Sequence, residues 1–484
     1  MAEPQRLTNW AGNYKFSAQR VHRPRTVEEV QQIVQRCKKL RVLGTGHSFN
    51  GIADCDEDLI SLEYMNQVLS IDHVKSTVAV EGGIKYGDLA VYLHTNGYGL
   101  HNLASLPHTT VAGAISTATH GSGDGNGNLA IAVAGMQVVN GRGEVVDLGR
   151  DANPHEFEGA VVSLGGLGVI TKLTLDVVPT YEIRQDVYQK LSFNAVQENF
   201  EKIFSSAYSV SIFTDWKSST FNQLWVKSRV EPGAKWVPAE AQKFGAILAK
   251  SDLHPIEGIS PINCTLQMGI PGSWHDRLPH FRMDFTPSSG KELQAEYIIP
   301  RQNAAAAIRR IEALKEHIAP VVQTCEIRTI AADTLWMSPC YKQECVGIHF
   351  TLIPDWPSVS RVLPMVDQVL EPLQTRPHWG KVTTMPPERV RSMYCKLPEF
   401  RQLLESFDPQ VMESAIELEM EDWVEDWEND VDEEGAMGLI DWEELNSNRW
   451  YSEVLTITFP HSNRDGVESI GGSPLVNGRK AFEM

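Results

Sequence analysis

Apolar residues recur along the chain with two spacings, one typical of helices and one typical of strands. A helix is predicted directly after Thr26, because Thr26 and Glu29 form a capping-box pattern in which Glu29 reaches back to Thr26, and apolar residues follow at helical spacing. A second helix is predicted over 86–94, closed by Asn96-Gly97. Strands are predicted at 41–44, 59–62, 68–71, 77–80, 130–140, 144–147 and 171–177.

The mixture of strands and helices continues beyond Pro179, with more tryptophan, proline and histidine. Further strands are predicted at 210–214, 224–230, 324–329 and 346–351, and a helix at 303–318. A chain of 484 residues is too long for one core, so two or three domains are expected. We predict an α+β fold with domains at 8–179 and 180–410 and a divergent segment at 411–484.

Composition excludes several classes of protein. Hydrophobic residues make up 42% and charged residues 22%, as in ordinary globular proteins, and the longest apolar stretch, 129–139, is too short to span a membrane. The start lacks the pattern of a secretory signal, so we expect a cytoplasmic protein that is not an integral membrane protein. Seven scattered cysteines without a CxxC pair favour free thiols and argue against a structural zinc site. No metal is predicted.

The net charge of -19 is concentrated in one segment. Between Glu413 and Glu444 there are fifteen acidic residues and no Lys or Arg. Overall acidity argues against a nucleic-acid partner. The acidic segment also carries tryptophans, which leaves two interpretations open: a loosely ordered tail, or a segment that docks on a basic protein surface.

The turn Gly44-Thr45-Gly46-His47-Ser48-Phe49 places one imidazole among very small residues. Glycines let a backbone approach a ligand closely, so His47 would face whatever lies against this turn. It is not a nicotinamide fingerprint, because Phe49 replaces the third glycine of GxGxxG. A surface turn with an incidental histidine is the alternative.

Nearly every side chain from Thr109 to Gly123 is small. Such a segment buries little apolar area, but it can let a large rigid ligand lie against main-chain N–H groups and hydroxyls. The alternative is a glycine-rich loop or a closely packed small-residue helix. A second site of close approach is predicted at Gly165-Gly166-Leu167-Gly168.

Two predicted strands of the second half pair polar residues on one face. Glu326 and Arg328 are two residues apart and project together, as do His349 and Thr351. An aromatic turn, His378-Trp379-Gly380, ends at Lys381. Each residue has a simpler interpretation: an ion pair, a core histidine or a solvated lysine.

Several of these motifs together resemble a known family. The GTGHS turn is similar to the flavin-binding turn of the vanillyl-alcohol-oxidase superfamily, whose members carry a PCMH-type FAD-binding domain. The set that resembles the alditol oxidases specifically comprises Ser105-Leu106-Pro107-His108, the stretch 272–282, Cys325-Glu326-Ile327-Arg328-Thr329, Trp336 and His378-Trp379-Gly380-Lys381. The resemblance covers roughly 8–410. Beyond Pro409 the chain departs from the usual ending of the family, which puts flavin retention in question.

The resemblance implies FAD joined covalently through His47, in an FAD-binding domain followed by a substrate (cap) domain. The residues that it places around the cofactor are Leu43, Gly44, Thr45, Gly46, His47, Ser48, Phe49, Ser105, Thr110, Gly113, Thr117, Ala118, Thr119, His120, Val169 and Ile170.

The resemblance also implies oxidation of a hydroxyl of a linear polyol such as xylitol, sorbitol or mannitol, with O2 reduced to hydrogen peroxide. Arg328 and Lys381 would stabilise the developing alkoxide, with Glu326 and His349 beside them as catalytic groups. The substrate would contact Ser105, Glu326, Arg328, Thr351 and Lys381. The alternatives are a sugar-1,4-lactone oxidase or dehydrogenase, and a flavoprotein that has lost catalysis and acts as a binding protein.

Overall fold

The computed structural model describes residues 7–231, 233, 242, 244–285, 290–408 and 457–458. The acidic stretch between Glu413 and Glu444, for which a tail or docking segment was predicted, lies outside the described residues. Within the described part of the chain, no helix is both long enough and apolar enough to cross a membrane.

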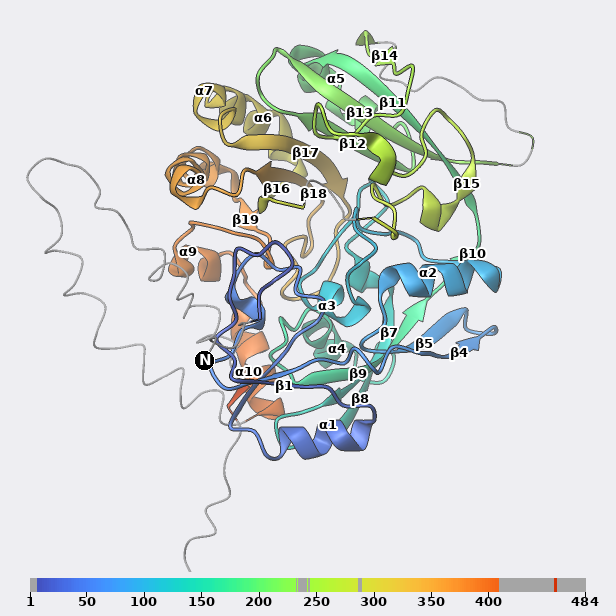
Figure 1. Cartoon of the computed structure of the whole chain (residues 1–484), viewed down its shortest axis with the longest axis vertical. Coiled ribbons are helices and arrows are strands. Elements are labelled where there is room, and N and C mark those ends of the chain that lie inside the picture. The colour runs from blue at the N-terminus through green and yellow to red at the C-terminus, as the bar shows by residue number, and fades with distance from the viewer. Residues whose placement is uncertain are drawn as a thin grey trace, which may run out of the picture.

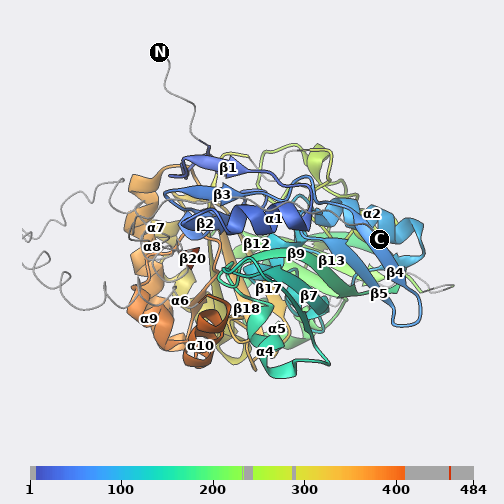
Figure 2. The same ribbon diagram turned by 90° about the horizontal axis from the view of Figure 1, so that it is seen from below.

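The first half contains two main sheets and a small strand pair (Figure 1). The four-stranded sheet has the order β1 (Arg20–His22), β3 (Asp58–Ile60), β2 (Lys39–Val42), β20 (Ile457–Thr458). The five-stranded antiparallel sheet has the order β4 (Val68–Asp72), β5 (Thr77–Glu81), β9 (Val169–Asp176), β7 (Val133–Val139), β8 (Val145–Gly149). The short strands β6 (Tyr98–Gly99) and β10 (Val178–Pro179) pair with each other. Figure 2 shows α1 (Val27–Val34) lying alongside these sheets.

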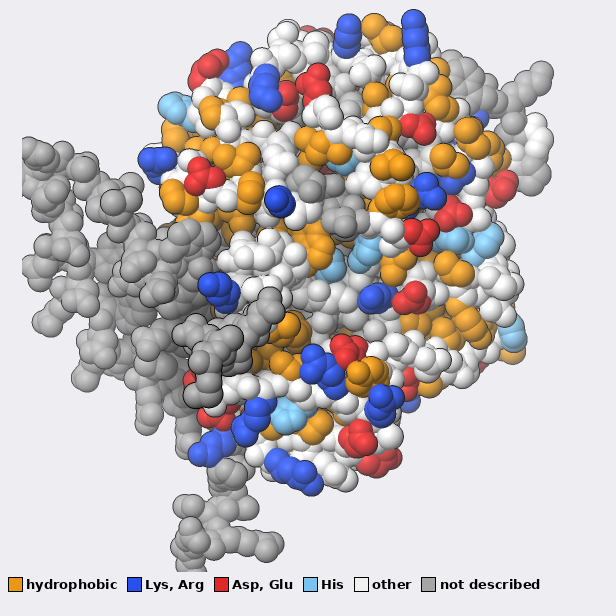
Figure 3. All heavy atoms as spheres, in the orientation of Figure 1, with side chains coloured by type: hydrophobic (Ala, Val, Ile, Leu, Met, Phe, Trp, Pro, Cys, Tyr) orange, Lys and Arg blue, Asp and Glu red, His pale blue; other side chains and the backbone are white. Residues whose placement is uncertain are grey.

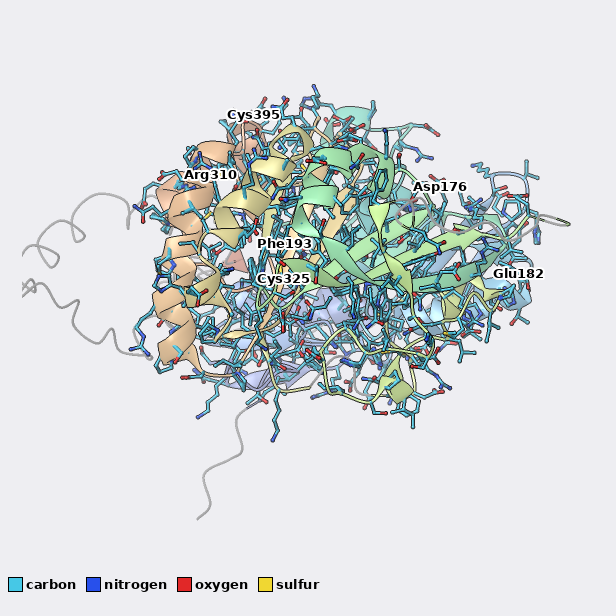
Figure 4. All side chains as sticks on the ribbon, turned by 90° about the horizontal axis from the view of Figure 1, so that it is seen from above. Asp176, Glu182, Phe193, Arg310, Cys325 and Cys395 are labelled. Atoms are coloured by element: carbon cyan, nitrogen blue, oxygen red, sulfur yellow. The ribbon has the colours of Figure 1, made fainter. Side chains whose placement is uncertain are left out.

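The second half is built on a nine-stranded antiparallel sheet. Its order is β14 (Ile247–Leu248), β11 (Glu182–Ser192), β13 (Thr220–Arg229), β12 (Ser209–Thr214), β17 (Val322–Ile330), β18 (Cys345–Leu352), β16 (Leu293–Pro300), β19 (Arg376–Pro377), with β15 (Gly272–Ser273) paired to β11. Figure 4 labels Asp176 and Glu182, the residues at which β9 ends and β11 begins. The limits predicted for the domains stay a prediction, although the large sheets fall on either side of Pro179.

Ten α-helices accompany these sheets among the described residues. They are α1, α2 (Tyr86–Thr95), α3 (Val111–Ser116), α4 (Pro154–Ala160), α5 (Phe193–Phe204), α6 (Ala304–Glu312), α7 (Lys315–Ile318), α8 (Trp356–Leu370), α9 (Pro387–Ser392) and α10 (Leu397–Phe407). The helix predicted over 303–318 is two helices, because the chain turns at Ala313 and Leu314. The strand predicted at 41–44 ends at Val42, so that Leu43 and Gly44 already belong to the turn.

The cap of α1 differs in one detail from its prediction. Thr26 accepts the N–H of Glu29, as expected, but Glu29 accepts the N–H of Arg25 at 2.6 Å rather than that of Thr26. The prediction of a reciprocal bond to Thr26 was therefore wrong by one residue. The carboxylate still satisfies a backbone donor at the start of the helix.

Alternation along the large sheet separates a face that packs into the core from a polar face. Cys325 and Ile327 of β17 pack into the main core, whereas Glu326 and Arg328 project from the opposite face. Helix α5 packs against β11 and β12 and α6 against β16, which covers the core face (Figure 1). The other face is left to carry polar residues.

The chain returns to the first half after this sheet. Gly159 of α4 leaves no room for a side chain, because an added Cβ would lie 2.8 Å from Leu403 of α10. Arg142 donates to the carbonyl of Ser406 at 3.1 Å. Strand β20 then pairs with β2 at Lys39 and Leu40, close in sequence to the turn that begins at Leu43.

Gly83 gives a test of how tightly the first half is built. Its added Cβ would lie 1.8 Å from the carbonyl oxygen of Leu62 and 2.7 Å from that of Met65, both of them backbone atoms. We expect Gly83→Ala to lower the free energy of unfolding by about 3 kcal/mol, measured by urea denaturation. Gly125→Ala is the control, since no atom lies within 4 Å of its added Cβ. Equal stability of the two variants would contradict the packing described.

Candidate active site

A cavity of about 780 Å³ lies between the two halves of the protein and is lined by residues of both. This volume is in the range of small-molecule sites. On the face of the protein shown in Figure 3, charged side chains of both signs are scattered among hydrophobic ones. The residues that line the cavity are described below.

The Gly44–Phe49 turn forms one wall of this cavity. Trp10 stacks on the His47 ring with centroids 5.3 Å apart, and His47 Nδ1 lies 2.9 Å from Thr45 Oγ1. His47 Nε2 is buried and has no hydrogen-bond partner among the described residues. Burial lowers the pKa of His47 to about 4, so its imidazole is neutral at pH 7. Because His47 lines the cavity, this unpartnered nitrogen is available to a bound group.

The neighbouring wall is built from small residues because larger ones do not fit. A Cβ on Gly44 would lie 2.7 Å from Thr110 Oγ1, and one on Gly113 would lie 2.8 Å from the same atom. The segment predicted to let a ligand approach the main chain contains the short helix α3, so part of the alternative, a small-residue helix, also holds. Thr109 Oγ1 and His108 Nδ1 are buried here without described partners.

Asn50 joins the Gly44–Phe49 turn to the loop that carries Lys381. Its Nδ2 donates to the carbonyls of Trp379 and Lys381, each at 2.9 Å, and the N–H of Phe49 donates to Gly380 O at 2.8 Å. These bonds fix the position of Lys381 relative to His47 across more than 330 residues of sequence.

Glu296 of β16 is the centre of a cluster of polar side chains on the polar face of the nine-stranded sheet. Its two oxygens accept from Arg328 Nη2 at 2.7 Å and from Lys381 Nζ at 2.6 Å. His120 Nε2 lies 3.2 Å from the first oxygen. Burial opposes the charge of Glu296, but Lys381 and Arg328 outweigh it and hold the pKa of Glu296 well below its usual range. The carboxylate is ionised and paired.

Arg328 connects Glu296 to a second carboxylate. Its Nε lies 3.6 Å from Glu326 Oε2 and has no hydrogen bond among the described residues, while its Nη1 donates to Ser105 Oγ at 3.4 Å. The backbone carbonyl of Ser105 accepts the N–H groups of His280 and Phe281. Ser105 thus connects the small-residue wall to Arg328 and to the segment that carries His280.

Lys381 is in contact with His349 as well as Glu296. The distance from Lys381 Nζ to His349 Nδ1 is 2.7 Å, and His349 Nε2 lies 3.2 Å from Thr351 Oγ1, as the predicted alternation requires. Burial lowers the pKa of Lys381, and burial together with the Lys381 charge lowers that of His349 to about 4. His349 is therefore neutral at pH 7, whereas the charge of Glu296 opposes the effect of burial on Lys381.

A third chain of polar contacts ends on Glu326. Lys227 Nζ contacts Leu278 O, Pro279 O at 3.2 Å and His280 Nδ1 at 3.0 Å. His280 Nε2 lies 2.7 Å from Glu326 Oε1. Burial lowers the pKa of Lys227 while the charge of Glu326 opposes this shift, and burial lowers the pKa of His280 to about 4.

Most of the residues singled out from the sequence line this one cavity. These are Leu43 to Phe49, Ser105, Thr110, Gly113, Thr117, Thr119, His120, Ile170, Glu326, Arg328, His349, Thr351 and Lys381. Ala118 and Val169 are buried in the protein and are not part of the lining. His120 Nε2 lies 3.2 Å from Glu296 Oε1, and the predicted contact of His120 with the cofactor stays a prediction.

Sequence reasoning missed Glu296, His280 and Lys227. A signal was present in two of them: a glutamate inside the apolar strand β16 and a lysine inside β13 are charges that burial must pair. The sequence of one strand does not show which distant residue pairs with a buried charge, so the cluster could not be predicted.

His120, Glu296 and His378 are close enough to hold a metal ion. Both oxygens of Glu296, however, already accept from cationic side chains, which removes the negative charge that a metal would need. That the protein needs no metal stays a prediction.

Two family models match separate parts of the chain. Residues 18–149 match the model of the FAD binding domain, and residues 286–417 match that of D-arabinono-1,4-lactone oxidase. The chain is 42% identical over 409 residues to the alditol oxidase of a Streptomyces species, covering 83% of this chain and 95% of the relative.

More distant relatives are lactone-oxidising enzymes. The chain is 26% identical to the L-gulono-1,4-lactone dehydrogenase of Mycobacterium tuberculosis, over 83% of this chain and 95% of the relative. It is 25% identical to the L-gulonolactone oxidase of Bos taurus, over 84% and 96%. The matched domains and the cavity define an FAD-dependent oxidoreductase. Within that class, the chain belongs to the alditol oxidase family.

Removal of the Glu296 charge tests the central cluster. Glu296→Gln leaves the buried Lys381 without its carboxylate and Arg328 with Glu326 alone, so we expect the free energy of unfolding at pH 7 to fall by about 3 to 5 kcal/mol. The pKa of Glu296 is lower in the folded than in the unfolded protein, so its stabilisation is present above about pH 4 and is lost as the pH falls further.

The measurement is urea denaturation of wild type and variant at pH 7 and at progressively lower pH. Glu399→Gln is the control, because Glu399 forms an exposed ion pair with Lys396. A Glu296→Gln variant as stable as this control at pH 7 would show that the cluster does not depend on the carboxylate.

Proposed function

We propose that this protein oxidises a hydroxyl-bearing carbon of a linear polyol to the carbonyl, with O2 reduced to hydrogen peroxide. The observation that carries the proposal is the cation pair Arg328 and Lys381, which shares the carboxylate of Glu296 on the face that lines the cavity. Cations, carboxylates, an imidazole and hydroxyls in one cavity supply the donors and acceptors that a polyol demands. The alditol oxidase relative supports the same substrate class.

The residues on the small-residue side fit FAD. A wall in which a Cβ on Gly44 or Gly113 would collide with Thr110, the buried Thr109 Oγ1, and the unpartnered Nε2 of His47 are features that suit a large rigid ligand. Residues 43 to 49, Thr110, Gly113, Thr117, Thr119 and Ile170 would hold it, and His47 would be its covalent attachment point. When bound, FAD supplies the acceptor of the hydride.

The chain's own residues then have to handle the hydroxyl. Glu296 and His349 take two of the three N–H donors of Lys381, which leaves one for a substrate oxygen. Arg328 Nη1 is a second donor, since it carries two N–H groups and its contact with Ser105 Oγ at 3.4 Å uses one of them. Together they would hold the oxygen and stabilise its developing negative charge in a site from which bulk water is largely excluded.

The hydroxyl proton needs an acceptor. The Lys381–His349 pair lies beside this oxygen site, and burial keeps the His349 imidazole neutral. The Lys381 ammonium would pass one proton to His349 Nδ1 across their 2.7 Å contact and take up the hydroxyl proton in its place. Ser105 and Thr351 add hydroxyls for the rest of the polyol chain.

The direct test of function is peroxide release. The purified yellow protein is supplied with xylitol, sorbitol, mannitol and L-gulono-1,4-lactone, and peroxide is measured for each. Turnover of the polyols in preference to the lactone is expected. Preference for the lactone would favour the lactone-oxidase alternative, to which the match at 286–417 gives some support.

Covalent attachment is tested by His47→Ala. The variant keeps the glycine wall but lacks the free imidazole nitrogen, so we expect its flavin to pass into the supernatant after acid precipitation. In wild type and in the control His73→Ala, flavin absorbance should stay with the precipitate, since His73 is exposed and contacts Tyr98 outside the cavity. Retention of flavin by precipitated His47→Ala would rule out this linkage.

Stabilisation of the oxygen is tested by Arg328→Gln. Loss of one buried donor to a developing oxyanion lowers turnover by about 100- to 1,000-fold, and we expect kcat/KM for the preferred polyol to fall by this factor. Arg229→Gln, on the same sheet but stacked on Tyr181 and Tyr208 away from the cavity, should stay within about twofold of wild type. Equal kinetics of the two variants would remove Arg328 from the reaction.

A further inference from the structure

Lys227 is a buried ammonium group outside the residues assigned to catalysis above. It belongs to β13, is 1% exposed and has Leu278 O, Pro279 O and His280 Nδ1 as neighbours of its nitrogen. An ammonium has three N–H donors, and these three acceptors use them all. Burying a charge so completely costs free energy, so its retention calls for a reason beyond packing.

The contacts of Lys227 fix the state of His280. Because the pKa of His280 is lowered to about 4, its ring is neutral and carries one proton. Lys227 donates to Nδ1, so that proton must be on Nε2, which then donates to Glu326 Oε1 at 2.7 Å. Lys227 therefore donates to His280, and His280 donates to Glu326.

The orientation of Glu326 follows from this chain. His280 occupies Oε1, so Oε2 is the oxygen left towards Arg328, at 3.6 Å from Arg328 Nε. That separation is too long for a good hydrogen bond. Oε2 and Arg328 Nε thus form an acceptor and a donor side by side, which is the arrangement that binds one hydroxyl group in both of its roles.

We propose that Lys227, acting through His280, is a positioning residue that holds Glu326 to bind a substrate hydroxyl away from the reacting carbon. The assignment rests on the proposed oxidation of polyols. A contact of this kind is made equally in the ground state and in the transition state, so its loss raises KM and leaves kcat nearly unchanged.

The test is a double-variant cycle with Lys227→Met and Glu326→Gln, using peroxide release from the preferred polyol. Lys227→Met should raise KM about 10-fold with kcat within about twofold. In the Glu326→Gln background the same change should have no further effect, because the group that Lys227 positions is already altered. Multiplicative effects, or a loss confined to kcat, would overturn the proposal.

A matched control separates positioning from general packing. Gln223 lies on the same face of β13, is buried, and donates to the backbone carbonyl of His254 at 2.7 Å without contacting His280 or Glu326. Gln223→Met should lower stability, measured by thermal unfolding, without the selective rise in KM. An equal rise in KM in this variant would reduce Lys227 to a packing role.

Substitutions of His280 give the same decision if Lys227→Met does not fold. His280→Gln keeps an acceptor for Lys227 and a donor for Glu326, whereas His280→Phe keeps only the ring. KM close to wild type in the first and raised in the second supports the relay, and equal KM values overturn it.

A cycle of urea unfolding with Lys227→Met and Glu326→Gln needs no substrate. Non-additive losses of stability are expected if Lys227 positions Glu326, and additive losses contradict it. A wild-type protein that oxidises no polyol would instead refute the proposed function, with the unfolding cycle still deciding whether Glu326 is held.

Discussion

The cost of burying two carboxylates is the constraint on which the site depends. Glu296 and Glu326 lie within one sheet face at 2% and 4% exposure, and neither would stay charged there alone. Arg328 lies between them, Lys381 forms an ion pair with Glu296, and His280 lies within hydrogen-bond distance of Glu326. Each cation that would act on substrate is therefore also one that the carboxylates need. Stability and chemistry are coupled because the same charges supply both.

The two lysines of the site use the same device. Lys381 contacts His349 Nδ1 and Lys227 contacts His280 Nδ1, and in both pairs burial keeps the imidazole neutral. A lysine against one ring nitrogen determines what the other nitrogen offers, to Thr351 in one pair and to Glu326 in the other. The loop that carries Lys381 is in turn held by Asn50 against the His47 turn. The polar cluster around Glu296 and the His47 turn are therefore positioned as one unit.

Much of this arrangement could be predicted from the sequence, and the limit of prediction has a physical basis. Alternation placed Glu326 with Arg328 and His349 with Thr351, because strand periodicity is local. The small-residue stretch indicated a close approach for the same reason. Glu296 lies on β16, and its partners Arg328 and Lys381 come from β17 and the loop after β19. Their meeting depends on strand order, which a local sequence pattern does not contain. The error at Glu29 is smaller and arises from a competing backbone donor one residue away.

The order of strands also explains why charged residues are tolerated inside apolar runs. Glu296 and Lys227 stand in strands whose other face packs into the main core, so each strand must be apolar on one side only. In the sequence each is a single charged residue in a strand that is otherwise largely buried. A buried charge without a partner would destabilise the fold. Antiparallel pairing brings β16 beside β18, and β18 beside β17, so that Glu296 lies within reach of Arg328 and of the loop carrying Lys381. A buried charge in a predicted strand is thus best interpreted as one half of a pair whose other half is far away in the sequence.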